Sequence, residues 1–171
     1  MRALVWIVED TWEATVAEAA AFLPGDAEVT LLHVVPGDVE TLAEGSRHGL
    51  LGRRAGPPAP PERLRAISDE AAEALLVEAR ERLGRDARTE RRRGRVGHEV
   101  AAAADGMDLL VLARDGDRSR LGPHSLGPAA RFAVDHAPCR VLLVWADAPP
   151  DVETIPPLPE HPPQHRPPQH R

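Results

Sequence analysis

The sequence has no lysine, asparagine or tyrosine, and its single cysteine leaves it without the means to build a disulfide framework. One free thiol suits a reducing compartment, so we expect a cytoplasmic protein. Aromatic residues make up only 3% of the 171 residues, and the core must therefore consist of aliphatic side chains and alanine. The N-terminal apolar run, residues 3–8, stops at Glu9 and is too short for a signal peptide or a membrane span.

The charge balance bears on which partners the protein can have. The formal net charge is −6, and all 21 basic residues are arginine. An acidic chain is a poor ligand for phosphate backbones, so we expect no nucleic acid partner, and the short apolar runs predict no membrane association. The one dense basic run, Arg91–Arg93, is interpreted as the solvated edge of a sheet. A patch that binds anions is the alternative.

Apolar runs alternate with helical segments along the chain. "ALVWIV" and "EVTLLHVV" are typical of buried strands, whereas "ARTERRR" is too charged for any place but the edge of a sheet. The order β-α-β-α-β-α-β-α-β demands a parallel sheet, because each crossover returns the chain in the same direction. We therefore predict an α/β fold with a five-stranded parallel sheet and helices on both faces. The expected strands lie within residues 3–8, 28–35, 87–93, 108–113 and 140–145.

A sheet of this kind binds ligands in a crevice at the carboxyl ends of its strands. The loops expected there are residues 9–12, 35–38 and 113–127. The third contains "RDGDRSRLGPHSLG", with glycines and arginines between a buried strand and a helix. This is where α/β proteins often build a backbone cradle for phosphate.

Residues 36–67 form a long variable insertion rich in Gly, Pro and Arg. The stretch "GPPAPPER", residues 56–63, cannot be the interior of a helix or strand, and so long a connection is typical of a lid, a binding loop or disorder. Ser68 is expected to cap a strong helix that follows it. The expected buried stripe of this helix is Ala71, Leu75, Ala79 and Leu83.

The composition changes at Asp147, so we place one domain at residues 1–146 and a tail at 147–171. The tail is rich in proline and histidine and repeats "PPQHR" twice, which predicts an extended, disordered segment. Its three histidines could bind a transition metal weakly, and its prolines could engage a protein that reads polyproline. Those histidines are His161, His165 and His170.

Several segments together resemble the universal stress protein (UspA-like) family: "VED-T", "LLHVVP", "DLLVLAR" and "LGPAARFAVDHAPCRVLLVW". The resemblance covers residues 2–146, and the lack of lysine with the abundance of Ala, Gly and Pro is typical of a high-GC, actinobacterial-type member. It implies a flavodoxin-like, Rossmann-like fold and a homodimer paired through the last strand, residues 141–145. Many members bind ATP or a related adenine nucleotide.

The nucleotide motif of that family is degenerate in this chain. The resemblance places spaced glycines at Arg114 and Asp117, a hydroxyl residue at Pro128 and an aspartate at Glu9; of the diagnostic glycines only Gly127 is present. The candidate nucleotide-binding residues, with Val34 expected against adenine, are Glu9, Val34, Ala113, Arg114, Gly116, Asp117, Gly127 and Pro128.

These departures weaken a phosphate cradle for physical reasons. Glycine reaches the backbone conformations of such a cradle most freely, Asp117 adds a negative charge, and Pro128 lacks an N–H group. Each lost charge-assisted hydrogen bond is worth about 1.5–3 kcal/mol, so we expect no standard ATP binding. ATP or AMP could instead be held by guanidinium groups. The arginines concerned are Arg114, Arg118 and Arg120, and the competing interpretation pairs them with Asp115, Asp117 or Asp135.

We find no Ser-His-Asp pattern and no paired acids, so no catalytic residue is predicted. His136 and Cys139 have the spacing of metal ligands, but a single pair does not define a metal site, and none is predicted. The sequence favours a non-catalytic regulatory module that acts through protein contacts. The alternatives are a nucleotide sensor using arginines and a scaffold whose tail binds a partner or a metal.

Overall fold

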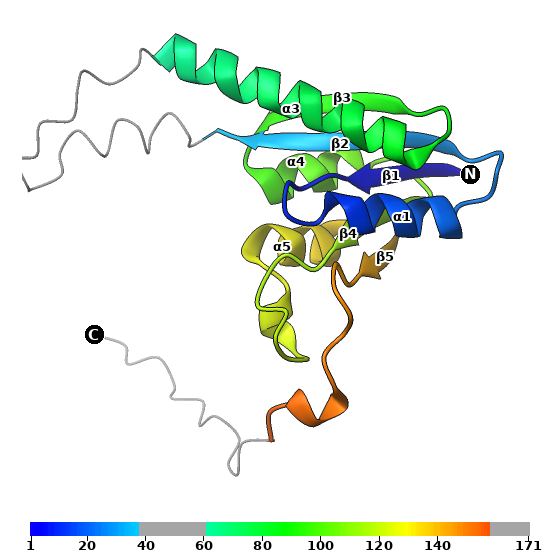
Figure 1. Cartoon of the computed structure of the whole chain (residues 1–171), viewed down its shortest axis with the longest axis vertical. Coiled ribbons are helices and arrows are strands. Elements are labelled where there is room, and N and C mark those ends of the chain that lie inside the picture. Colours follow the sequence, from blue (N-terminus) through cyan, green and yellow to red (C-terminus); the bar gives the residue numbers. More distant parts are fainter. Residues whose placement is uncertain (38–60, 158–171) are drawn as a thin grey trace, which may run out of the picture.

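The computed structural model describes residues 1–37 and 61–157, and a parallel sheet forms its centre (Figure 1). The sheet has five strands in the order β3-β2-β1-β4-β5, and every neighbouring pair is parallel. This confirms the predicted fold class. The strands are β1 (Arg2–Trp6), β2 (Glu28–Pro36), β3 (Arg88–Gly94), β4 (Leu109–Ala113) and β5 (Arg140–Val144).

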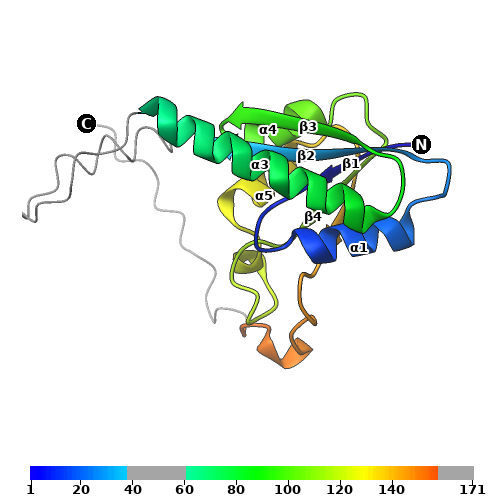
Figure 2. The same ribbon diagram turned by 45° about the horizontal axis from the view of Figure 1, so that its top comes forward.

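Two helices cover each face of the sheet (Figure 2). The helices α1 (Trp12–Phe22) and α3 (Pro61–Leu83) pack on one face, and α4 (Val96–Ala103) and α5 (Pro128–His136) pack on the other. Each central strand divides its side chains between the two layers, because successive residues of a strand point to opposite faces. In β1, Ala3 and Val5 join the core under α1 and α3. Leu4 and Trp6 join the core under α4 and α5.

The charged strand β3 lies at one edge of the sheet, as predicted. Its arginines have partners in neighbouring elements. Asp69 of α3 lies 3.2 Å from Arg91 and 2.8 Å from Arg93, and Arg92 contacts the Glu90 carboxylate at 2.6 Å. These pairs support the interpretation of the run as a solvated edge, since the charge is balanced locally.

The helix α3 begins earlier than predicted. It starts at Pro61, so Ser68 lies inside it, and the Ser68 hydroxyl donates to the carbonyl of Arg65 at 2.9 Å. Proline is tolerated there because the first turn of a helix leaves its N–H groups without partners. The end of the expected insertion, residues 61–67, is therefore helical, and residues 38–60 lie outside the described residues.

The buried face of α3 also differs in part from the predicted one. Ala72, Leu76, Ala79 and Leu83 are buried, whereas Ala71 is exposed and Leu75 only half-buried.

Within the described residues, no helix is both long and apolar enough to cross a membrane.

The order of the strands places a switch point between β1 and β4, where the chain winds away in opposite directions. The loop that follows β4, residues 114–127, emerges there and leads into α5. It contains the 3-10 turn η2 (Pro123–Ser125). The switch point therefore brings the expected site loop to the carboxyl edge of the sheet.

Candidate functional site

The loop of residues 114–127 folds back on itself. The Gly116 amide donates to the Ser125 carbonyl at 3.0 Å, and the Asp117 amide donates to the His124 carbonyl at 2.8 Å. These N–H groups point at the loop's own carbonyl groups. A phosphate cradle needs successive N–H groups that converge on an external anion, so this part of the loop is not arranged as one.

Gly116 is required by the close approach of the two sides of the loop. A Cβ atom at this position would lie 2.3 Å from the His124 carbonyl oxygen and 2.9 Å from the carbonyl carbon of Ser125. Both atoms belong to the backbone, so neither can move aside easily. Gly116 was predicted as a candidate nucleotide-binding residue, and in the structure it permits the closure of the loop.

The Asp115 carboxylate occupies the start of α5. Its Oδ1 accepts a hydrogen bond from the Gly127 amide at 2.7 Å, and Gly127 is the residue that precedes the first turn. The amino end of a helix attracts anions because its N–H groups are unpaired and its dipole is positive there. Pro128, the next residue, has no N–H to offer. A side chain of the protein thus holds the position where an external anion would bind.

The hydrogen bond of Asp115 to the Gly127 amide is the contact in this loop that sequence reasoning missed. Asp115 was considered only as a surface partner for arginines, and the structure shows that this interpretation was wrong for this residue. The two bonded residues are separated by twelve positions, so no local motif connects them. The only available signal was a carboxylate in a loop that ends in Gly-Pro at the start of a helix.

The three loop arginines all have partners among the described residues. Arg114 Nη1 donates to the Ser125 hydroxyl, and its guanidinium carbon lies 4.6 Å from the centre of the Trp145 ring. Arg118 Nε pairs with Asp147 at 2.8 Å. The third arginine pairs inside the loop, where Arg120 Nε lies 3.2 Å from Asp117 Oδ2. Of the acids that the sequence suggested as partners, only Asp117 takes this role.

Asp117 is held in its ionised form. Its Oδ1 accepts hydrogen bonds from the Ser119 hydroxyl at 2.5 Å and from the Ser119 amide at 3.1 Å. These bonds, with the positive charge of Arg120, lower the pKa of the Asp117 carboxyl below its ordinary value. The loop therefore carries a negative charge at Asp117.

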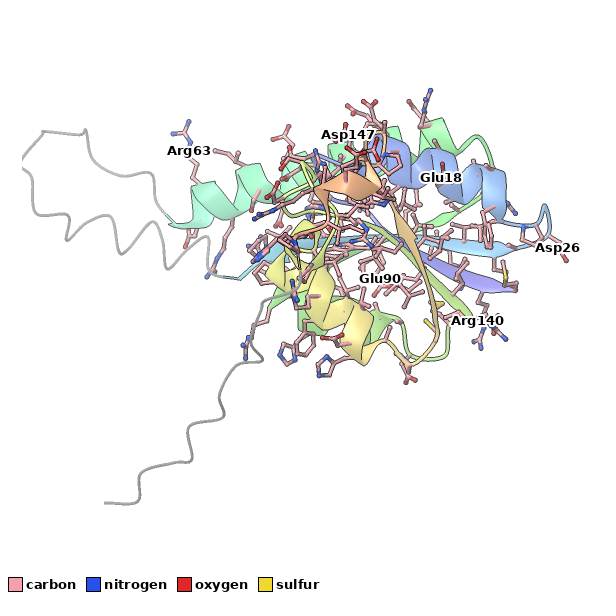
Figure 3. The ribbon with its side chains drawn as sticks, turned by 90° about the horizontal axis from the view of Figure 1, so that it is seen from below. Glu18, Asp26, Arg63, Glu90, Arg140 and Asp147 are labelled. Atoms are coloured by element: carbon pink, nitrogen blue, oxygen red, sulfur yellow. The ribbon has the colours of Figure 1, made fainter. Side chains whose placement is uncertain are left out.

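The remaining candidate residues lie in different surroundings. Val34 is only 4% exposed and packs in the core under α4 and α5, and Ala113 is buried at the end of β4. Glu9 is exposed and borders a hollow of about 320 Å³. Asp147, labelled in Figure 3, lies on the segment after β5 and lines the same hollow. Its other lining residues are Asp10, Thr11, Trp12, Glu13, Ala14 and Ala146.

His136 and Cys139 do not form a metal centre in the structure. His136 Nδ1 lies 2.9 Å from the Phe132 carbonyl, and its ring stacks on Phe132 with a centroid distance of 4.0 Å. Cys139 is half-buried, and this burial raises the pKa of its thiol. Across residues 1–37 and 61–157, no three or more His, Cys, Asp or Glu side chains gather in a way that could hold a metal ion.

A doubly wound parallel sheet with a glycine-containing loop at its switch point defines an α/β domain of the class that binds ligands at the carboxyl edge. The chain belongs to the universal stress protein family, because the model of the Universal stress protein family matches residues 4–144. No curated protein matches the sequence.

Solved structures share the fold of this chain. The hypothetical protein MJ0577 aligns with a TM-score of 0.64 and 19% identity, over 84% of this chain and 94% of its own. The universal stress protein UspA from Lactobacillus plantarum aligns with a TM-score of 0.55 and 22% identity, over 84% of this chain and 97% of its own. A universal stress protein in complex with cAMP aligns with a TM-score of 0.58 and 15% identity, over 86% of this chain and 98% of its own. At these identities the similarity supports the fold.

Proposed function

We propose that this protein is a non-catalytic regulatory module of the stress response that does not bind ATP in the manner typical of its family. The observation that carries this proposal is the hydrogen bond from the Gly127 amide to the Asp115 carboxylate. The family resemblance supports the proposal as well, since it places Arg114 and Asp117 of the same loop at glycine positions of the nucleotide motif. A domain whose anion position is already filled is suited to act through contacts with other proteins.

The energetic argument concerns what a phosphate group must displace. To reach the start of α5 it must remove the Asp115 carboxylate from the Gly127 amide, and a bond to a charged group is worth about 1.5–3 kcal/mol. It must also approach the ionised Asp117, whose charge repels it. Opening the loop further breaks the bonds of the Gly116 and Asp117 amides. These costs add up before any new contact forms.

Calorimetric titration of the purified protein with ATP, ADP and AMP, each with and without magnesium, tests this proposal. We expect no binding at micromolar concentrations of any of the three. Micromolar affinity of the unaltered protein for one of them would contradict the proposal. The variant Asp115→Asn keeps an acceptor for the Gly127 amide and removes the charge, so it tests whether the charge excludes the nucleotide.

A second candidate function is an adenine-nucleotide sensor that uses Arg114, Arg118 and Arg120 in place of a glycine cradle. The neighbouring structure in complex with cAMP favours it, because it shows a nucleotide bound to a universal stress protein. In this chain ATP or AMP would have to replace the present partners of these arginines. If titration detects binding, Arg114→Ala and Arg118→Ala should weaken it at least tenfold. The control Arg82→Ala, on the exposed last turn of α3, should not.

We further propose a homodimer formed through residues 141–145, which comprise most of β5 and Trp145. This strand lies at the open edge of the sheet, and Val141, Leu142 and Leu143 are only half-buried within one chain. An edge strand presents unpaired backbone groups, and apolar side chains beside them favour pairing with another chain. A second copy offers the same strand, so the pairing can be symmetric.

A further inference from the structure

The segment that follows β5 runs along the loop of residues 114–127 (Figure 1). Residues 147–157 belong to the stretch that the sequence assigned to a disordered tail. In the structure they include the 3-10 turn η3 (Val152–Thr154), which lies beside the tip of the loop. The chain therefore continues to contact the domain beyond the expected boundary at Asp147.

The loop and the segment after β5 contact each other at three successive points, and the contacts follow the direction of the chain in both. At the base of the loop, Arg114 lies over the Trp145 ring at 4.6 Å, and its amide donates to the Val144 carbonyl at 2.9 Å. Further along, Arg118 pairs with Asp147. These contacts join a cation to an aromatic ring and then a cation to a carboxylate, and both types are directional.

The third meeting point is at the tip of the loop. The Leu121 amide donates to the Thr154 hydroxyl at 3.0 Å, and the two residues are 33 positions apart. The same hydroxyl donates to the Asp151 carbonyl at 2.6 Å, which directs its lone pairs toward the loop. A backbone amide with a side-chain acceptor from so distant a residue ties the tip to the segment.

Prolines stiffen the segment that makes these contacts. Pro149 and Pro150 lie between Asp147 and η3, and Pro156 and Pro157 follow the turn. Because proline fixes its own φ angle, fewer backbone conformations are lost when the segment docks. A stiff connection also keeps the spacing between Asp147 and Thr154 matched to the loop.

We propose that residues 145–157 form a latch that holds the loop of residues 114–127 closed. While the latch is docked, the loop keeps its internal hydrogen bonds and Asp115 stays on the Gly127 amide. When the latch is released, the tip loses the acceptor of its Leu121 amide, and the loop opens more often than the core of the domain. The latch thus sets how accessible the switch-point loop is to a partner.

Hydrogen exchange of the full-length protein, followed amide by amide by NMR, tests the latch. The double variant Asp147→Asn with Thr154→Val removes one charge and one acceptor from the segment and changes nothing in the loop. We expect the amides of Gly116, Asp117 and Leu121 to exchange about tenfold faster or more, while the amides of β1 and β4 keep their rates. The matched control is Glu153→Gln, an exposed carboxylate in the same turn.

Two results would overturn the proposal. Unchanged exchange of the three loop amides would show that the segment does not hold the loop. Equal acceleration of loop and core amides would show that it stabilises the whole domain instead. A second variant, Arg118→Gln, breaks the same ion pair from the loop side, and it must accelerate the loop amides and not the core amides, by a smaller factor because the Thr154 acceptor remains. No nucleotide is present in these measurements, so their outcome is independent of the proposed function.

Discussion

The Asp115 carboxylate accepts a 2.7 Å hydrogen bond from the Gly127 amide and so caps α5 from twelve residues upstream. Side chains that cap helices usually come from the residue next to the first turn. Here the capping group comes from the far end of the loop, and the bond joins the two ends of that loop. Closure of the loop and satisfaction of the helix end are therefore the same interaction.

Replacing Asp115 with alanine should lower the free energy of unfolding by about 1–2 kcal/mol, as expected when a helix loses a capping acceptor. Asp115→Asn retains an acceptor and should cost less than the alanine variant. Urea denaturation followed by circular dichroism measures both changes. The control Asp135→Asn alters an exposed carboxylate on α5 and should stay within about 0.5 kcal/mol of the unaltered protein. Equal stability of Asp115→Ala and the control would show that the bond does not stabilise the fold.

Gly116→Ala should be among the more destabilising single changes in the loop, at about 2 kcal/mol or more, because its Cβ meets backbone atoms. Gly25→Ala provides a matched control, since a Cβ there has no atom within 4 Å. That variant should be neutral or up to about 1 kcal/mol more stable, because alanine restricts the unfolded chain. Thermal denaturation compares the two, and similar melting temperatures would contradict the close approach at Gly116.

Ser119→Ala should raise the pKa of Asp117 toward its ordinary value, since the Ser119 hydroxyl donates the hydrogen bond that lowers it most. In the unaltered protein, the lowered pKa favours folding at any pH above the ordinary carboxyl pKa. This contribution is lost as the pH falls through the lowered value, so acid should loosen the loop. An NMR titration of side-chain carboxyl carbons measures the shift. Asp108, whose pKa is lowered by a hydrogen bond from the Arg2 amide, should not respond and serves as internal control.

Leu143→Arg should convert the proposed dimer to a monomer, because it places a charge at the apolar edge strand β5. Light scattering coupled to size-exclusion chromatography measures the mass directly. The control Thr89→Arg lies on the opposite edge strand, β3, which is already rich in arginine, and should leave the mass unchanged. A monomeric unaltered protein, or a dimer that survives Leu143→Arg, would contradict pairing through β5.

Local pattern was enough to predict the strands and their arrangement. Apolar runs of strand length, such as Leu109–Ala113, are buried throughout, and alternation with helices leaves only a parallel sheet. The charged side chains of β3 were enough to predict that this strand lies at an edge of the sheet. The beginning of α3 was not predictable in this way, because proline terminates a helix in its interior but is favoured in its first turn, and position alone decides which applies.

The candidate site was predicted in its place but not in its contacts. The loop lies at the switch point as expected, yet its arginines have partners that local reasoning did not reach, such as Asp147 for Arg118. A surface pairing was expected, and its partner came from a segment that composition assigned to a mobile tail. Composition reports how much apolar surface a segment can bury, and it does not report single hydrogen bonds to a distant loop.

By itself the sequence determined the fold class and the edge position of β3, because these depend on residue type and on periods of two or 3.6 residues. Only the tertiary structure decided that Asp115 fills the start of α5 and that Thr154 holds the Leu121 amide. Both bonds join residues far apart in the chain. Their partners are chosen by where the folded sheet places the ends of β4 and β5, and no local pattern contains that information.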